Sequence, residues 1–119
     1  MIKGMHGMFY SSEPEKLRLF FKEVLELPAT DIGEGWLIYD IKAADLGVHP
    51  SKSPGHPETQ SGTADISFFC ENLEESVEKL KAKGAIFKGP IEDHGYGFVT
   101  FISAPGNFWI QLYQPKYSK

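Results

Sequence analysis

The chain repeats one order of elements twice, and this repeat constrains the fold more than any other feature. Alternation over residues 5–11 predicts a strand, and the apolar spacing that follows predicts an amphipathic helix ended by Pro28. That spacing is i, i+3, i+4, i+7, i+8, carried by Leu17, Phe20, Phe21, Val24 and Leu25. Short strands follow at 36–41 and 45–49. The order then restarts with a strand at 63–70, a helix near Asn72, and strands at 85–87, 98–102 and 108–113. The sequence therefore predicts two βαβββ modules.

Corresponding residues of the two halves keep a nearly constant offset. His6 overlays Asp65, the helix caps Ser12 and Asn72 correspond, and Asp45 overlays Gln111, with small drifts that loops absorb. We expect a single domain over 1–119, with module 1–50 and module 63–115 joined by a Pro/Gly-rich linker at 51–62. The predicted fold class is α+β, with the paired modules forming a cupped mixed sheet.

The composition limits the classes of partner. The net charge is −4 and the basic residues are scattered, which argues against nucleic acid or a membrane surface as partner. No window resembles a signal peptide or a membrane span. The single cysteine, Cys70, lies in an apolar strand and is interpreted as a buried thiol. We therefore expect a cytoplasmic protein.

Strand alternation separates a helix-facing side from an opposite side in four strands. The opposite side carries one metal-capable or polar residue in each strand: His6, Asp45, Asp65 and Gln111. Aromatic and other large side chains accompany them and are candidate substrate-binding residues: Met8, Tyr10, Trp36, Phe69, Tyr96, Trp109 and Tyr113. This pattern predicts a concave cup with convergent polar groups, and a solvent-facing strand surface is the alternative.

The turn Ser103-Ala104-Pro105-Gly106-Asn107 between two apolar runs predicts a tight hairpin. Its Ala104–Asn107 portion, the helix segment 19–28 and the paired modules resemble the vicinal oxygen chelate superfamily. That superfamily includes glyoxalase I, bleomycin- and fosfomycin-resistance proteins, and extradiol dioxygenases. The resemblance covers essentially the whole chain and implies the glyoxalase/bleomycin-resistance-like fold. It also implies that the family's four metal positions fall on His6, Asp45, Asp65 and Gln111.

Gln111 departs from the pattern of the active family members that this chain resembles. Glyoxalase I has a carboxylate at this position that takes part in proton transfer, and an amide has no comparable basic lone pair. The resemblance therefore argues against ordinary glyoxalase I activity. The set of ligands is still compatible with one divalent metal ion (Mn, Mg, Ni or Zn), and no organic cofactor is expected. Alternatively, Asp45 and Asp65 are hydrogen-bonded pocket groups.

Two histidines outside the metal set are candidate catalytic acid/base residues. His94 lies in the glycine-punctuated loop at 93–97, and His49 shares the face of Asp45. An exposed loop histidine is the alternative interpretation of His94. If a metal is bound, the resemblance implies Lewis-acid polarisation of an oxygen substrate, with His94, His49 or Asp65 moving the proton.

The sequence leaves two functions open. One is small-molecule binding with metal-dependent lyase or isomerase activity, and the other is a metal-free drug- or metabolite-sequestering protein of bleomycin-resistance type. A ferredoxin-like ligand sensor would require the order βαββαβ, which the predicted strands before the linker do not fit. The resemblance also implies a homodimer.

Overall fold

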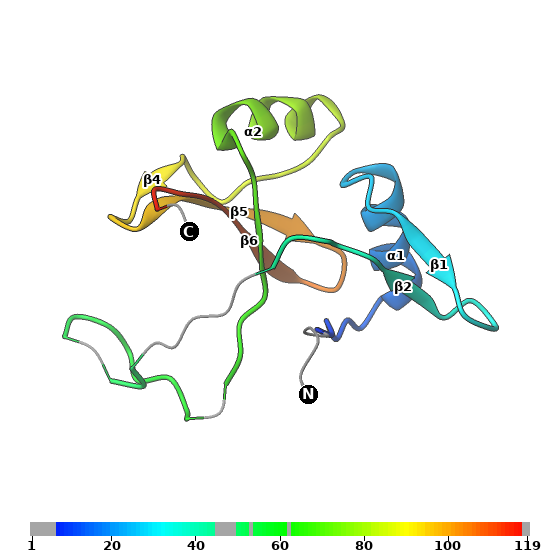
Figure 1. The fold of residues 1–119 in the computed structure, drawn as a ribbon, viewed down its shortest axis with the longest axis horizontal. Helices are drawn as coiled ribbons and strands as arrows, with labels where there is room; N and C mark the ends of the chain where they lie inside the picture. Colours follow the sequence, from blue (N-terminus) through cyan, green and yellow to red (C-terminus); the bar gives the residue numbers. More distant parts are fainter. Residues whose placement is uncertain (1–6, 45–49, 53, 62, 118–119) are drawn as a thin grey trace.

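The computed structural model describes residues 7–44, 50–52, 54–61 and 63–117 (Figure 1). In these residues the chain forms an α+β fold, as predicted. The elements in chain order are α1 (Pro14–Glu23), β1 (Ala29–Asp31), β2 (Leu37–Tyr39), β3 (Ser67–Phe69), α2 (Leu73–Ala82), β4 (Glu92–Asp93), β5 (Gly97–Ala104) and β6 (Phe108–Pro115). The strand predicted at 45–49 lies outside the described residues. Neither helix of the described ranges is long and apolar enough to cross a membrane.

The second module forms a mixed sheet of four strands in the order β3-β6-β5-β4. β3 runs parallel to β6, while β5 pairs antiparallel with both β6 and β4. With α2 between β3 and β4, this half has the βαβββ order, although β4 at Glu92–Asp93 stands where the sequence predicts a strand at 85–87. β1 and β2 pair antiparallel in a separate two-stranded sheet, which belongs to the first module.

The β5–β6 hairpin is confirmed as the sequence predicts it. Ala104 pairs with Phe108 at the end of the ladder, and Gly106 and Asn107 take left-handed backbone conformations in the turn, with φ of 105° and 62°. Glycine adopts such angles without a steric cost, and asparagine tolerates them better than most residues. The turn chemistry therefore explains why the chain reverses here.

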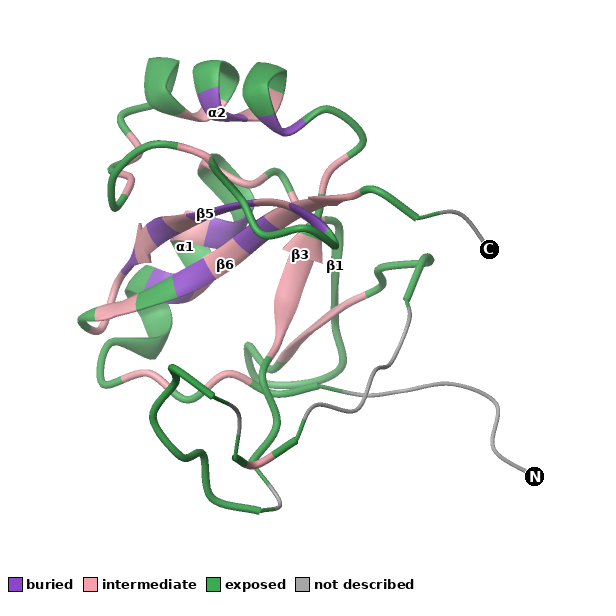
Figure 2. Ribbon diagram, turned by 90° about the vertical axis from the view of Figure 1, so that its left-hand side faces the viewer, coloured by how far each residue is buried: buried purple, intermediate pink, exposed green. Residues whose placement is uncertain are grey.

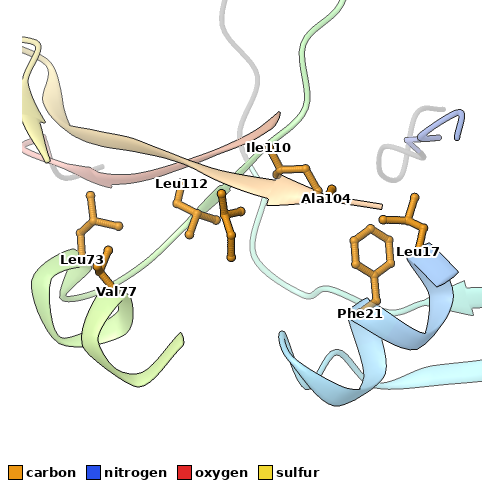
Figure 3. Close-up of a cluster of buried hydrophobic side chains, with 8 residues drawn as sticks. Leu17, Phe21, Leu73, Val77, Ala104, Ile110 and Leu112 are labelled. Carbon is orange, nitrogen blue, oxygen red and sulfur yellow. The ribbon is translucent and has the colours of Figure 1, made fainter. Parts of the chain in front are cut away.

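Both helices pack against one side of this hairpin. Figure 3 shows Leu73 and Val77 of α2 and Leu17 and Phe21 of α1 directed toward it. The hairpin contributes Ile102, Ala104, Ile110 and Leu112 to the same buried cluster. Figure 2 shows that buried residues concentrate on β5, β6 and the helix faces turned to them. One core thus joins the two modules.

Phe9 anchors the N-terminal segment to this core. Its ring centroid lies 6.0 Å from that of Phe21, 6.1 Å from Phe68 and 5.9 Å from Phe108. A Cβ added to Gly7 would lie 2.9 Å from Ile66 Cδ1, so the segment also runs close to the chain before β3. The helix-facing position predicted for Phe9 is confirmed. The described residues 7–11 have no strand assignment, so the strand predicted over 5–11 is not formed in them.

The predicted cap of the first helix is wrong by one residue. Glu13 holds the N-cap position without a side-chain cap, and the Ser11 hydroxyl accepts a hydrogen bond from the Glu13 N–H at 3.0 Å. The same hydroxyl donates to the Pro105 carbonyl at 2.9 Å. Ser11 rather than Ser12 is used because it also reaches the hairpin turn. The helix ends at Glu23, and Glu26 takes a φ of 55° before Pro28.

The second helix begins as predicted. The Asn72 side chain accepts from the Glu75 N–H at 3.1 Å, and Gln114 Oε1 of β6 accepts from the Leu73 N–H at 2.9 Å. The strand predicted at 85–87 is reduced to a single antiparallel bridge between Phe87 and Ile102. The linker has no helix or strand in its described residues, and in Figures 1 and 2 it lies on the side of the sheet away from α2.

Candidate functional site

The face of the four-stranded sheet turned away from the helices carries the candidate site. Residues of one parity on β3, β5 and β6 contribute to the helix-packed core, so the other parity points to the opposite side. In the described part of the chain, α1 and α2 both pack on the core side (Figure 3). We call the opposite side the open face, and its residues are Ser67, Phe69, Glu92, Val99, Phe101, Ser103, Trp109, Gln111 and Tyr113. Glu92, on the edge strand β4, is the charged residue of this set.

Strand register arranges the open face in rows. Gln111 of β6 lies between Ser67 of β3 and Phe101 of β5. The next row places Tyr113 between Phe69 and Val99.

On the other side of Gln111, Trp109 pairs with Ser103. The amide is therefore flanked along its own strand by two aromatic rings.

Aromatic rings contact one another in the row of Phe69 and Tyr113. The centroids of Phe69 and Tyr113 are 6.1 Å apart, and Tyr96, just before β5, lies 6.4 Å from Tyr113. Phe69 and Tyr96 remain 44% and 50% exposed, and Trp109 is 43% exposed. Val99 beside Tyr113 is only 1% exposed. On the open face, the buried Val99 therefore lies next to aromatic rings that are exposed to solvent.

One polar contact joins Gln111 to the edge of this aromatic group. Gln111 Nε2 donates to the Tyr96 hydroxyl over 3.5 Å. Tyr113 and Tyr117 also bring their hydroxyls within hydrogen-bond distance, at 3.2 Å. The structure therefore brings together four of the predicted substrate-binding residues with one predicted metal ligand: Phe69, Tyr96, Trp109, Tyr113 and Gln111.

The β4–β5 turn places Tyr96 over the sheet. The His94 N–H donates to the Gly97 carbonyl at 2.9 Å, and the Gly95 N–H donates to Asp93 Oδ1 at 2.9 Å. Lys116 Nζ donates to both carboxylate oxygens of Asp93 at 2.7 Å, and its backbone N–H donates to the Tyr96 carbonyl at 2.9 Å. The residues after β6 therefore tie down the turn that carries Tyr96.

His94 lies beside this group. Its Nε2 is 3.2 Å from Glu92 Oε2, and its ring centroid is 6.1 Å from that of Tyr96. A histidine paired with a carboxylate in this way is oriented for proton exchange, and its catalytic role stays a prediction. His49, the second predicted catalytic residue, lies outside the described residues.

We expect a titration to report the anchoring of the turn. The Lys116 hydrogen bond, followed by the Gly95 N–H, holds the pKa of Asp93 below its ordinary value. A carboxyl with a lowered folded-state pKa contributes stability above its unfolded pKa and loses it as pH falls through the folded pKa. In NMR titration of the Asp93 carboxyl, Lys116→Met should raise the midpoint toward the ordinary value. Lys52→Met, near Glu58, should leave it unchanged, and equal midpoints in all proteins would contradict the assigned contact.

The described residues do not by themselves make a metal centre. His6 and Asp45 lie outside them, and the ranges that the structure describes contain no group of three or more His, Cys, Asp or Glu suited to a metal ion. Asp65 is exposed, two residues before β3, and Gln111 contributes one neutral amide oxygen. A carboxylate and an amide leave a divalent ion short of ligands unless His6 and Asp45 supply them.

Three further predicted substrate-binding residues lie on segments other than the strands of the open face. Met8 and Tyr10 are exposed in the N-terminal segment, Tyr10 by 88%. Trp36 precedes β2, and its ring lies 6.0 Å from the Arg18 guanidinium. Their roles stay predictions.

Sequence reasoning missed Phe101 and Lys116. Phe98, Val99 and Phe101 are all apolar, so alternation in this strand is ambiguous, and only the pairing of Phe101 with Gln111 assigns it to the open face. The contact between Lys116 and Asp93 has no local sequence signal. Cys70 is a half-buried residue against the core, and burial raises the pKa of its thiol, as expected for a structural cysteine.

Comparisons with known proteins agree with this geometry. A model of the glyoxalase/bleomycin resistance protein/dioxygenase superfamily matches residues 5–112. A curated lactoylglutathione lyase of Schizosaccharomyces pombe is 33% identical over 58 residues, which are 49% of this chain. The chain spans about a fifth (19%) of that relative's length.

Solved structures share the fold at low sequence identity. TnmS3, an antibiotic binding protein from Streptomyces sp. CB03234, is 22% identical with a TM-score of 0.62, covering 89% of each chain. A lactoylglutathione lyase from Agrobacterium tumefaciens is 11% identical with a TM-score of 0.60, covering 89% of this chain and 88% of its own. At these identities the likeness concerns the fold, which hosts more than one function.

Proposed function

The chain belongs to the glyoxalase/bleomycin resistance protein/dioxygenase superfamily, and from this premise we propose that it binds a planar small molecule on the open face. The observation that carries the proposal is the uncharged, ring-lined surface around Gln111. Phe69, Trp109 and Tyr96 expose much of their ring area there. An aromatic surface with a few polar groups is the usual chemistry of small-molecule sites.

Stacking and burial supply the binding energy in this proposal. A flat ligand would cover ring surface that Phe69 and Trp109 now leave exposed to solvent, and aromatic pairs add attraction beyond the area that they bury. The fold likeness to an antibiotic binding protein supports this class of function, because it shows the scaffold in a protein named for binding a small molecule. We therefore favour a sequestering or carrier role.

The test compares a flat probe with a saturated one. We expect 2-acetylnaphthalene to shift the backbone amide NMR signals of β3, β5 and β6, and cyclohexyl methyl ketone to shift them far less. Phe69→Ala should weaken binding of the naphthalene probe about threefold to tenfold, since a ring pair contributes roughly 0.5–1.5 kcal/mol. Leu19→Ala, which removes an exposed apolar side chain from α1 on the other side of the sheet, is the control and should leave the affinity unchanged.

A metal-dependent lyase or isomerase is the second candidate. The partial match to a lactoylglutathione lyase favours it, and it requires His6 and Asp45 to complete the ligand set with Asp65 and Gln111. Metal analysis of untagged protein after incubation with Mn²⁺, Mg²⁺, Ni²⁺ and Zn²⁺ separates the two. Stoichiometric metal that is lost in both Asp65→Ala and Asp45→Ala would support the enzyme, and absence of metal would exclude it. A homodimer, measurable by light scattering, is expected in either case.

A further inference from the structure

We propose that the bound molecule is uncharged and carries a hydrogen-bond donor and acceptor side by side on one edge, which Gln111 and Tyr96 recognise together. This inference rests on the proposed function and deepens it by stating the class of ligand. It also gives Gln111 a role of its own, as a specificity-determining residue of the open face.

The hydrogen-bond inventory of the pair leads to this class. Gln111 Nε2 donates to the Tyr96 hydroxyl, so the hydroxyl proton is free to donate elsewhere. No hydrogen-bond partner of Gln111 Oε1 is found among the described residues, and the amide also keeps its second N–H. Exchanging the amide nitrogen and oxygen still leaves amide donors beside a hydroxyl acceptor. In either orientation the pair presents a donor and an acceptor to the same neighbour.

The charges around the open face favour a neutral ligand. The residues that surround Gln111 on the sheet, Ser67, Phe101, Trp109 and Tyr113, are all uncharged. At the β4 edge Glu92 lies 3.2 Å from His94 Nε2, and in the adjoining turn Lys116 pairs with Asp93. Lys88 lies at the far end, 5.9 Å from the centre of the Trp109 ring. An ion settling over Gln111 would lose hydration without gaining a matching counter-charge.

The position of Gln111 fits a flat ligand with one polar edge. The amide lies between Tyr113 and Trp109 along β6, so a ring stacked on either of them has its edge next to Gln111. Tyr96 approaches the same point through its contacts with Tyr113 and Gln111. A ligand edge with one hydrogen-bonding atom can bond to only one of Gln111 and Tyr96, whereas an amide-like edge can bond to both side chains.

The experiment titrates labelled protein with probes that share one ring system. 2-Naphthamide carries the donor and acceptor, 2-acetylnaphthalene the acceptor alone, 2-naphthoate a negative charge and 2-naphthylmethylammonium a positive charge. We expect the amide to bind about threefold to tenfold more tightly than the ketone, and both more tightly than the two ions. Equal binding of amide and ketone, or tightest binding of either ion, would overturn the inference.

Two variants assign the preference for the amide to Gln111 and Tyr96. Gln111→Leu and Tyr96→Phe should each reduce the advantage of the amide over the ketone toward equal affinity. Ser103→Ala, which removes a hydroxyl from the neighbouring strand of the same face, should preserve the advantage. An advantage that survives in both Gln111→Leu and Tyr96→Phe would contradict the assignment. Failure of every probe to shift the β3, β5 and β6 amides would instead refute the proposed function itself.

Discussion

Gly106→Ala should lower the free energy of unfolding by about 2–4 kcal/mol, because two separate effects add at this turn. Gly106 has a φ of 105°, where a side chain is strained. A Cβ there would also press against the Ser11 side-chain oxygen and lie 3.3 Å from Ser11 Cβ and 3.4 Å from the Ser12 nitrogen. Ser11 is the residue that ties the N-terminal segment to Pro105, so the substitution displaces that connection as well.

Gly89→Ala separates the two effects. Gly89 has a φ of 76°, and a Cβ built there meets nothing within 4 Å, so it carries the backbone cost alone, about 1 kcal/mol. Urea unfolding of both variants, followed by circular dichroism, gives the comparison. Equal losses in the two proteins would show that the Ser11 contact does not matter for stability.

Ile110→Ala should have an effect of the same order or larger, about 2–5 kcal/mol, because it opens a cavity where both helices meet the hairpin. Ile110 is 1% exposed and belongs to the cluster shared with Leu17, Phe21, Leu73 and Val77 (Figure 3). It also lies between Trp109 and Gln111 on β6, so its loss disturbs the strand that carries the site. We therefore expect weaker binding of naphthalene probes along with the lost stability.

Replacing an exposed isoleucine by alanine is the control, because it removes the same atoms without opening a cavity. Ile32 is 64% exposed beyond β1, and Ile32→Ala should change the free energy of unfolding by less than about 0.5 kcal/mol. Chemical denaturation of the two variants under one set of conditions is the measurement. A loss below about 1 kcal/mol in Ile110→Ala would mean that the hairpin does not join the two helices in a common core.

Local signals predicted much of the second module. Asn72 caps α2 through its own side chain, and the alternation of Trp109, Gln111 and Tyr113 against Ile110 and Leu112 predicted the face on which each lies. These features depend on neighbouring residues along the chain. The turn before β6 likewise depends on neighbouring residues, because its glycine accepts a positive φ.

Contacts between distant segments could not be predicted in this way. Ser11 replaces Ser12 at the start of α1 because Ser11 can also reach Pro105, far along the chain. The pairing of Ser67 with Gln111 and the ion pair of Lys116 with Asp93 likewise depend on how strands meet. Alternation assigned Gln111 to the open face, and only the folded chain brought Tyr96 to its amide.

The central claim is that the open face binds a flat, neutral molecule around Gln111. The most direct measurement is an NMR titration of the labelled protein with 2-naphthamide, mapped residue by residue. We predict that the largest shifts fall on Phe69, Gln111, Tyr113 and the turn at Tyr96, and that Phe69→Ala weakens them together. Shifts confined to other parts of the chain, or no saturable shift at any residue, would contradict the account.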